Sequence, residues 1–136
     1  MQVLIIDGQG GGIGRALVEQ IRAAKLPVTL VAVGTNAAAT SAFLKAGAEA
    51  CATGENAVIF NAARADVIMG PLGLISANAL MGEISPAMAA AISASEAVKL
   101  LLPTQRCNIR ISGYPSKPLA VQVKEAVEEL SRLVEV

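Results

Sequence analysis

The stretch that decides the fold is Asp7-Gly8-Gln9-Gly10-Gly11-Gly12-Ile13-Gly14. It follows the apolar run 3–6 (VLII) and precedes 15–21 (RALVEQI), which has the apolar spacing of a helix. Five of the chain's 12 glycines lie within it. A strand, a glycine-rich turn and a helix in this order direct backbone N–H groups and a helix N-terminus toward an anionic ligand. The stretch therefore predicts an anion-binding loop.

The rest of the chain alternates between strand-like and helix-like segments. Runs of apolar and β-branched residues predict strands, and apolar residues three or four positions apart predict helices. The predicted strands are 2–7, 28–33, 48–52, 66–70, 98–102 and 108–112; the predicted helices are 12–25, 37–46, 55–63, 86–95 and 118–134; residues 72–84 are either a loop or one or two helical turns. This alternation predicts a three-layer, doubly wound, Rossmann-like α/β fold. We expect a mostly parallel sheet of five to six strands in a single domain, residues 1–136.

Composition limits the partners of this chain. Hydrophobic residues make up 54% of it and charged residues 16%, with no net charge. So few charges leave apolar surface to be buried between subunits, and we expect a homo-oligomer; a compact monomer with an alanine-rich surface is the alternative. Without a basic stripe or many aromatic residues, nucleic acid is not expected as a partner.

The sequence also bears on location and metals. No run approaches the roughly 18 apolar residues of a membrane span, so no membrane partner is expected. There is no signal-peptide pattern, and two cysteines are too few for a disulfide framework, which together favour a cytoplasmic protein. Because histidine is absent and the two cysteines are far apart, no metal site is predicted.

Two strict phosphate-binding motifs do not match the glycine-rich stretch. In the dinucleotide fingerprint G-x-G-x-x-G, counting from Gly8 puts Ile13 at the third glycine, and counting from Gly10 puts Arg15 there. In the P-loop G-x-x-x-x-G-K-[ST], Arg15 takes the place of the lysine and Ala16 that of the hydroxyl residue. A nucleotide triphosphatase is therefore not expected.

A looser spacing matches better. Gly8, three further residues and then Gly12-Ile13-Gly14 resemble the G-x-x-x-G-I-G loop of short-chain dehydrogenases over roughly residues 1–35. The resemblance implies NAD(P) binding. Asp7 stands where that family usually has Thr, which puts one loop-bracing hydrogen bond in doubt. The family's Tyr-x-x-x-Lys pair has no counterpart, since Tyr114 and Lys117 are three residues apart with Pro115 between them. No catalytic residue is carried over, and whether the protein is an enzyme stays open.

Nearly the whole chain resembles an uncharacterised family of short bacterial Rossmann-like proteins, catalogued as a domain of unknown function. The shared stretches are 6–14, 34–36, 52–56 and 106–108. This resemblance implies the fold and no established activity.

The predicted site lies where the strands end. NAD sites place an acidic residue near the end of the second strand to hold the ribose, and here Thr35 and Asn36 stand instead, which favours NADP mildly over NAD. Asn36 is equally well explained as a helix cap. Glu55, Asn56 and Glu83 are lesser candidates. The predicted cofactor-binding residues are Gly8, Gln9, Gly10, Gly11, Gly12, Ile13, Gly14, Thr35, Asn36, Gly70, Pro71 and Arg106.

Three functions fit these features. The first is a protein that binds a phosphorylated nucleotide, with NADP or NAD as the expected cofactor. The second is a non-catalytic sensor or an oligomeric binding protein for another small anionic ligand. The third is a scaffold without a ligand, in which the alanine-rich surface is the functional part.

Overall fold

The structure is a computed structural model that describes residues 1–103 and 108–135. Five strands form one sheet in the order β3-β2-β1-β4-β5, and every neighbouring pair is parallel. This confirms the predicted doubly wound α/β fold. The elements are β1 Gln2–Asp7, α1 Gly12–Ala23, β2 Thr29–Gly34, α2 Ala37–Ala46, β3 Ala50–Thr53, α3 Glu55–Ala62, β4 Val67–Pro71, the 3₁₀ helix η1 Leu72–Ile75, α4 Pro86–Ala94, β5 Val98–Leu102 and α5 Leu119–Val134.

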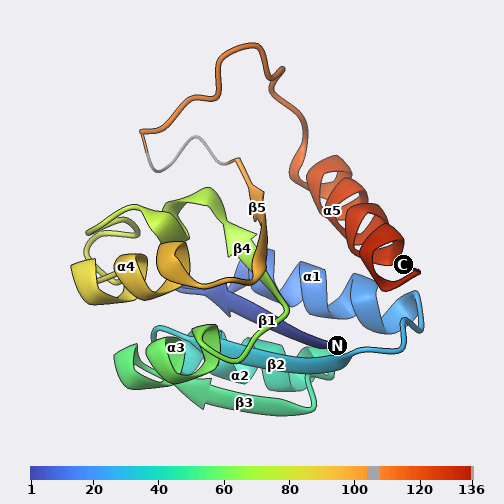
Figure 1. Cartoon of the computed structure of the whole chain (residues 1–136), viewed down its shortest axis with the longest axis horizontal. Coiled ribbons are helices and arrows are strands. Elements are labelled where there is room, and N and C mark those ends of the chain that lie inside the picture. Colours follow the sequence, from blue (N-terminus) through green and yellow to red (C-terminus); the bar gives the residue numbers. More distant parts are fainter. Residues whose placement is uncertain (104–107, 136) are drawn as a thin grey trace.

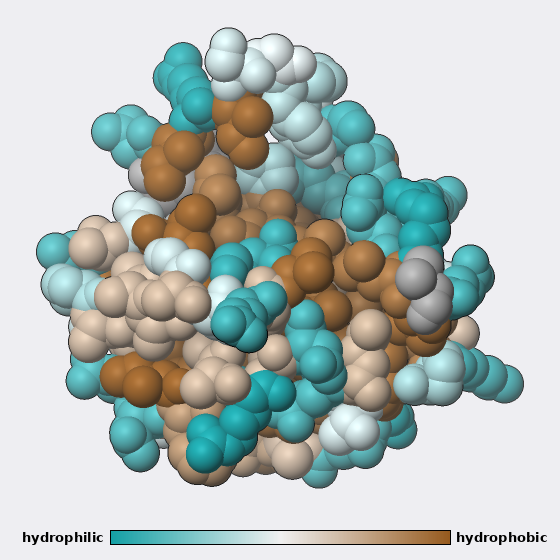
Figure 2. All heavy atoms as spheres, in the orientation of Figure 1, coloured by the Kyte–Doolittle hydropathy of each residue, from teal (hydrophilic) through white to brown (hydrophobic). Residues whose placement is uncertain are grey.

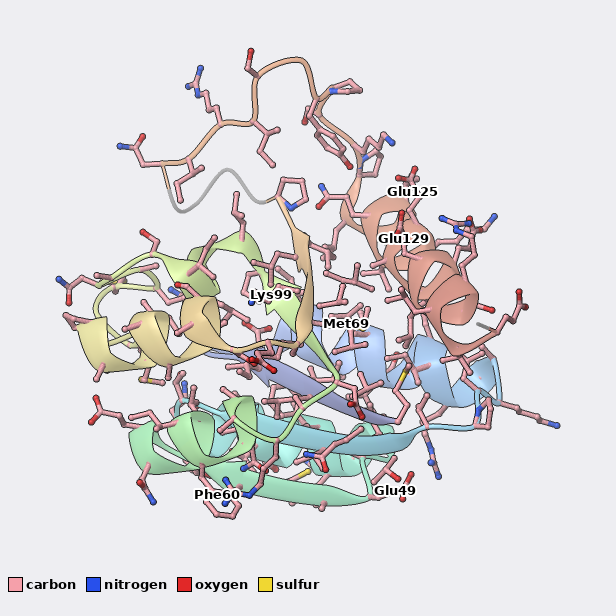
Figure 3. The ribbon with its side chains drawn as sticks, in the orientation of Figure 1. Glu49, Phe60, Met69, Lys99, Glu125 and Glu129 are labelled. Carbon is pink, nitrogen blue, oxygen red and sulfur yellow. The ribbon has the colours of Figure 1, made fainter. Side chains whose placement is uncertain are left out.

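Helices cover both faces of the sheet (Figure 1). Successive side chains of a strand point to opposite faces, so β1 supplies Val3 and Ile5 to one hydrophobic cluster and Leu4 and Ile6 to the other. Helices α1, α2 and α5 pack on the first cluster, and Met69 of β4 points into it (Figure 3). Helices α3 and α4 pack on the second. Burial on both faces explains why the strands are continuous apolar runs.

The chain reverses direction across the sheet at β1. It adds β2 and β3 on one side of β1, and then crosses to add β4 and β5 on the other side. In open parallel sheets, ligands bind outside the carboxyl ends of the strands at such a reversal. The glycine-rich stretch follows β1 and therefore lies at this point.

The predicted strand 108–112 is wrong. Residues 108–118 have no regular secondary structure and extend away from the sheet as the orange segment of Figure 1. The alternation of Ile109 and Ile111 resembles a strand, but alternation forms a strand only where a neighbouring strand supplies hydrogen bonds. In the described ranges no strand pairs with this segment, so the sheet has five strands.

Large hydrophobic side chains are exposed at the start of β5, in the segment 108–118 and at the start of α5. Figure 2 shows hydrophobic surface around this part of the molecule. The most exposed of these side chains are Val98, Ile111, Tyr114, Leu119 and Val121. None of the described helices has the length and hydropathy needed to cross a membrane.

Candidate anion-binding site at the glycine loop

The turn between β1 and α1 is built from backbone contacts that favour glycine. The N–H of Gly11 donates to the carbonyl of Gly8 at 2.8 Å, which closes the turn. Gly11 has a φ of 73°, in the left-handed region, and helix α1 begins at the next residue. The N-terminus of α1 therefore lies at the carboxyl edge of the sheet.

Asp7 braces this turn from inside. Its carboxylate accepts the N–H of Gly8 at 2.8 Å and the N–H of Gly14 at 2.9 Å, and the residue is only 5% exposed. Burial raises the pKa of Asp7 above its ordinary value of 3.8, and the bonds from the backbone of Gly14 and Gly8 oppose that rise. The Asp7 carboxylate, which points inward, thus braces the loop where the sequence put one such hydrogen bond in doubt.

Three of the five glycines are explained by contacts within the protein. A Cβ atom on Gly8 would collide with Thr35 and Glu83. One on Gly11 would lie 3.0 Å from the Cα of Ala39, and one on Gly14 would lie 2.5 Å from the ring of Phe43. These glycines are required for packing, whatever else the loop does.

Gly10 and Gly12 have no such explanation. Both are exposed, and a Cβ atom on either would meet nothing within 4 Å. Neither has a φ in the left-handed region. In residues 1–103 and 108–135, the N–H of each also finds no hydrogen-bond acceptor. The described residues thus leave two exposed glycines at the N-terminus of α1 whose N–H groups have no acceptor within the protein.

Glu83 reaches this loop from a distant part of the chain. It lies between η1 and α4, and its Oε1 atom accepts the hydroxyl of Thr35 at 2.6 Å, the side-chain amide of Asn36 at 2.8 Å and the N–H of Gln9 at 2.9 Å. The bonds from Thr35 and Gln9 lower the pKa of Glu83 below its ordinary value of 4.5. Glu83 therefore places a carboxylate next to the end of β2, where the neighbouring sequence has none.

Asn36 has the capping role that the sequence predicts. Its Oδ1 accepts the N–H of Ala39 at 2.9 Å at the start of α2, and its Nδ2 donates to the carbonyl of Gln9 at 3.0 Å. Thr35 and Asn36 are thus already bonded to protein groups. The partners of Glu83 are 47 to 74 positions away, and no local sequence pattern signals such contacts, so the sequence alone does not single out Glu83.

The remaining predicted site residues are Gly70, Pro71 and Arg106. Gly70 and Pro71 are buried at the end of β4, and a Cβ atom on Gly70 would collide with the carbonyl oxygen of Ile6. Close packing of β4 on β1 therefore accounts for Gly70, and its approach to a ligand stays a prediction. Arg106 lies outside the described residues. Glu55 bonds to Ser85.

The glycine loop is an open edge of the molecule and lines neither of two cavities found elsewhere. One, of about 260 Å³, lies against the C-terminal part of α1 and the start of β2. The other, of about 280 Å³, lies between α1 and α2 and includes Arg15 and Lys45. Among the described residues, no three acidic or cysteine side chains are grouped so that they could hold a metal ion.

Comparisons with known proteins give a family and a distant structural likeness. No curated protein matches the chain. Among solved structures, the dodecameric FMN-dependent UbiX-like decarboxylase from Escherichia coli O157:H7 is 16% identical, and the match covers 96% of this chain and 76% of that chain with a TM-score of 0.47. That likeness says nothing about the ligand of this protein. A family model named "Domain of unknown function (DUF3842)" matches residues 2–135, and the chain belongs to that family.

Proposed function

We propose that this protein binds a phosphate-bearing nucleotide, NAD(P) or a related molecule, at the N-terminus of α1. The observation that carries the proposal is the pair of exposed glycines, Gly10 and Gly12, which no contact with the described residues requires. Glycine in place of alanine costs about 0.5–1 kcal/mol within a helix or strand because the unfolded chain is more flexible. Close approach of a ligand to the backbone gives these two positions a reason to lack side chains.

Positive charge at the start of α1 favours a phosphate there, whereas the Glu83 carboxylate bonded to Gln9 opposes a phosphate close to it. The N-terminus of α1 carries roughly half a positive charge. Arg15 lies in the first turn of α1, is exposed, and is paired with Glu19 only at 3.7 Å, so it is free to turn toward an anion. Asp7 is turned inward, away from the exposed amides. The site also lies at the reversal of strand order where such sheets bind ligands.

Thermal unfolding of the purified protein tests the proposal. It would be measured with NAD, NADP, their reduced forms, ATP and coenzyme A. A ligand present at 100 times its dissociation constant stabilises the folded state by about 2.7 kcal/mol, which is a shift of several degrees for a domain of this size. If no nucleotide shifts the unfolding temperature, the proposal fails.

A single substitution separates binding from folding. Gly12→Asp adds a carboxylate where there is space, at the first position of α1, where negative charge favours the helix. We expect the unfolding temperature without ligand to be unchanged or slightly raised and the nucleotide-induced shift to disappear. The matched control is Ala120→Asp, which adds the same charge at an exposed position in the first turn of α5. The control should keep the full shift.

A second candidate is a binding protein for a smaller phosphate compound. It is favoured by the open edge at the loop, which lines neither of the two cavities described above. Inorganic phosphate alone would then reproduce the thermal shift and the loss in Gly12→Asp. A nucleotide-binding protein would instead need the nucleoside for most of its affinity.

We also propose that the protein is a homo-oligomer. The exposed hydrophobic side chains at the start of β5, in the segment 108–118 and at the start of α5 support this, because an exposed apolar patch commonly marks an interface. Sedimentation of the purified protein would give the mass of the assembly. A monomer at micromolar concentration would contradict the proposal.

A further inference from the structure

We infer that Glu83 makes this site select a nucleotide whose ribose keeps its free hydroxyl pair and reject one that carries a 2′-phosphate. The inference rests on the proposed function, because it assigns a substrate class to the same site. It reverses the preference for NADP that Thr35 and Asn36 suggest from the sequence alone. The carboxylate that decides the preference comes from the segment between η1 and α4.

The Glu83 carboxylate is held in one place. Its Oε1 takes donors from the turn after β1 and from Thr35 and Asn36 after β2. Bonds from separate segments fix a long side chain that would otherwise be mobile. A Cβ atom on Gly8 would lie 2.8 Å from Oε1, so the carboxylate sits directly over Gly8 and beside the exposed backbone of the loop.

The second oxygen of Glu83 remains available. No donor to its Oε2 is found in the part of the chain that the structure describes, and the residue is partly exposed. An ionised carboxylate has about four acceptor positions. With Oε1 occupied by protein donors, Oε2 is the atom that can accept a ribose hydroxyl. Carboxylates recognise the ribose pair in this way at the end of the second strand of dinucleotide sites.

The same charge opposes a phosphate on that ribose. A 2′-phosphate would stand against an ionised carboxylate, and within residues 1–103 and 108–135 no basic side chain bonds to Glu83 to neutralise it. A hydrogen bond from the ribose hydroxyl to the carboxylate strengthens the binding of NAD. Repulsion between the carboxylate and the 2′-phosphate weakens the binding of NADP. We therefore expect at least about tenfold tighter binding of NAD than of NADP.

Paired titrations of NAD and NADP by calorimetry test this. The two ligands differ only by the 2′-phosphate, so the ratio of their dissociation constants isolates the ribose contact. In Glu83→Gln we expect the ratio to fall to within about threefold, with NAD weakened and NADP strengthened. Glu83→Asp keeps the charge and should still reject NADP. The control Glu96→Gln removes an exposed carboxylate just before β5, at the opposite edge of the sheet, and should leave the ratio unchanged.

The outcomes separate this inference from the proposed function. If Glu83 only clamps the loop, Glu83→Gln will weaken both ligands equally and leave their ratio unchanged, which overturns the inference alone. Wild-type protein that binds NADP as tightly as NAD overturns it without any variant. Absence of binding by either ligand overturns the proposed function and the inference together.

Discussion

Gly14 and Phe43 lie so close that a Cβ atom added to Gly14 would come within 2.5 Å of Cε1 of the Phe43 ring. Phe43 is a residue of α2, and its side chain is completely buried. The last glycine of the loop therefore lets α1 approach α2, and its role differs from that of the exposed Gly10 and Gly12.

Gly14→Ala should destabilise the protein by about 1–3 kcal/mol, because the buried ring cannot move aside without disturbing the core. Gly12→Ala should leave the free energy of unfolding unchanged or raise it by up to about 1 kcal/mol, because its Cβ meets nothing. Urea unfolding of both variants measures the difference. Equal losses would contradict the division of the glycines into packed and exposed positions.

Gly70→Ala should be more damaging than Gly14→Ala, by about 3 kcal/mol or more relative to wild type. Its Cβ would collide with the carbonyl oxygen of Ile6, and the backbone of two central strands cannot separate without loss of their hydrogen bonds. Gly10→Ala is the control, because it adds the same methyl group in open space. Denaturation monitored by circular dichroism would rank the three variants, and a stable Gly70→Ala would be inconsistent with this packing.

Asp7 should make stability fall as the pH rises. Its pKa is raised in the folded state, so the folded protein holds the proton more tightly than the unfolded chain does. The contribution of Asp7 to the stability of the folded state is therefore fully present below about pH 3.8, and it is lost as the pH rises through the folded-state pKa. The side chain in Asp7→Asn does not titrate, so the stability of this variant relative to wild type should increase as the pH rises through that range. Unfolding in urea at a series of pH values measures this, and a difference that stays constant or changes in the opposite direction would refute it.

Glu83 should have the opposite pH dependence. Its pKa is lowered in the folded state. Its contribution to stability is therefore present above about pH 4.5 and is lost as the pH falls through the folded-state pKa. The stability gap between wild type and Glu83→Gln should therefore narrow on acidification. The same urea series detects it, and Glu96→Gln, which removes an exposed carboxylate just before β5, serves as the comparison.

Asn36→Ala should destabilise the protein by about 1 kcal/mol through loss of the cap on α2. Asn36→Ser keeps an oxygen for the N–H of Ala39 but loses the amide that bonds to Gln9 and Glu83. We expect Asn36→Ser to recover most of the thermal stability. Equal losses in Ser and Ala would show that the contacts to Gln9 and Glu83 matter more than the cap.

The alternation of elements and several of their ends are determined by the sequence itself. The predicted bounds of α2 and β5 agree with the structure. Asn36 caps α2, Gly47 ends it in the left-handed region, and Ser85 followed by Pro86 starts α4. These signals act between residues at most a few positions apart, so they can be read along the chain.

The tertiary structure alone decides what depends on distant contacts. Among the described residues, no strand pairs with the strand-like segment 108–112. The Asp7 side chain points inward, and Glu83 contacts Gln9 and Asn36, which are 74 and 47 positions away in the sequence. The tertiary structure also separates the glycines that packing requires from Gly10 and Gly12, which face open space. The sequence by itself therefore determined the fold class and the place of the loop. The free amides and the carboxylate beside them depend on how β1, β2 and the segment before α4 meet at the edge of the sheet.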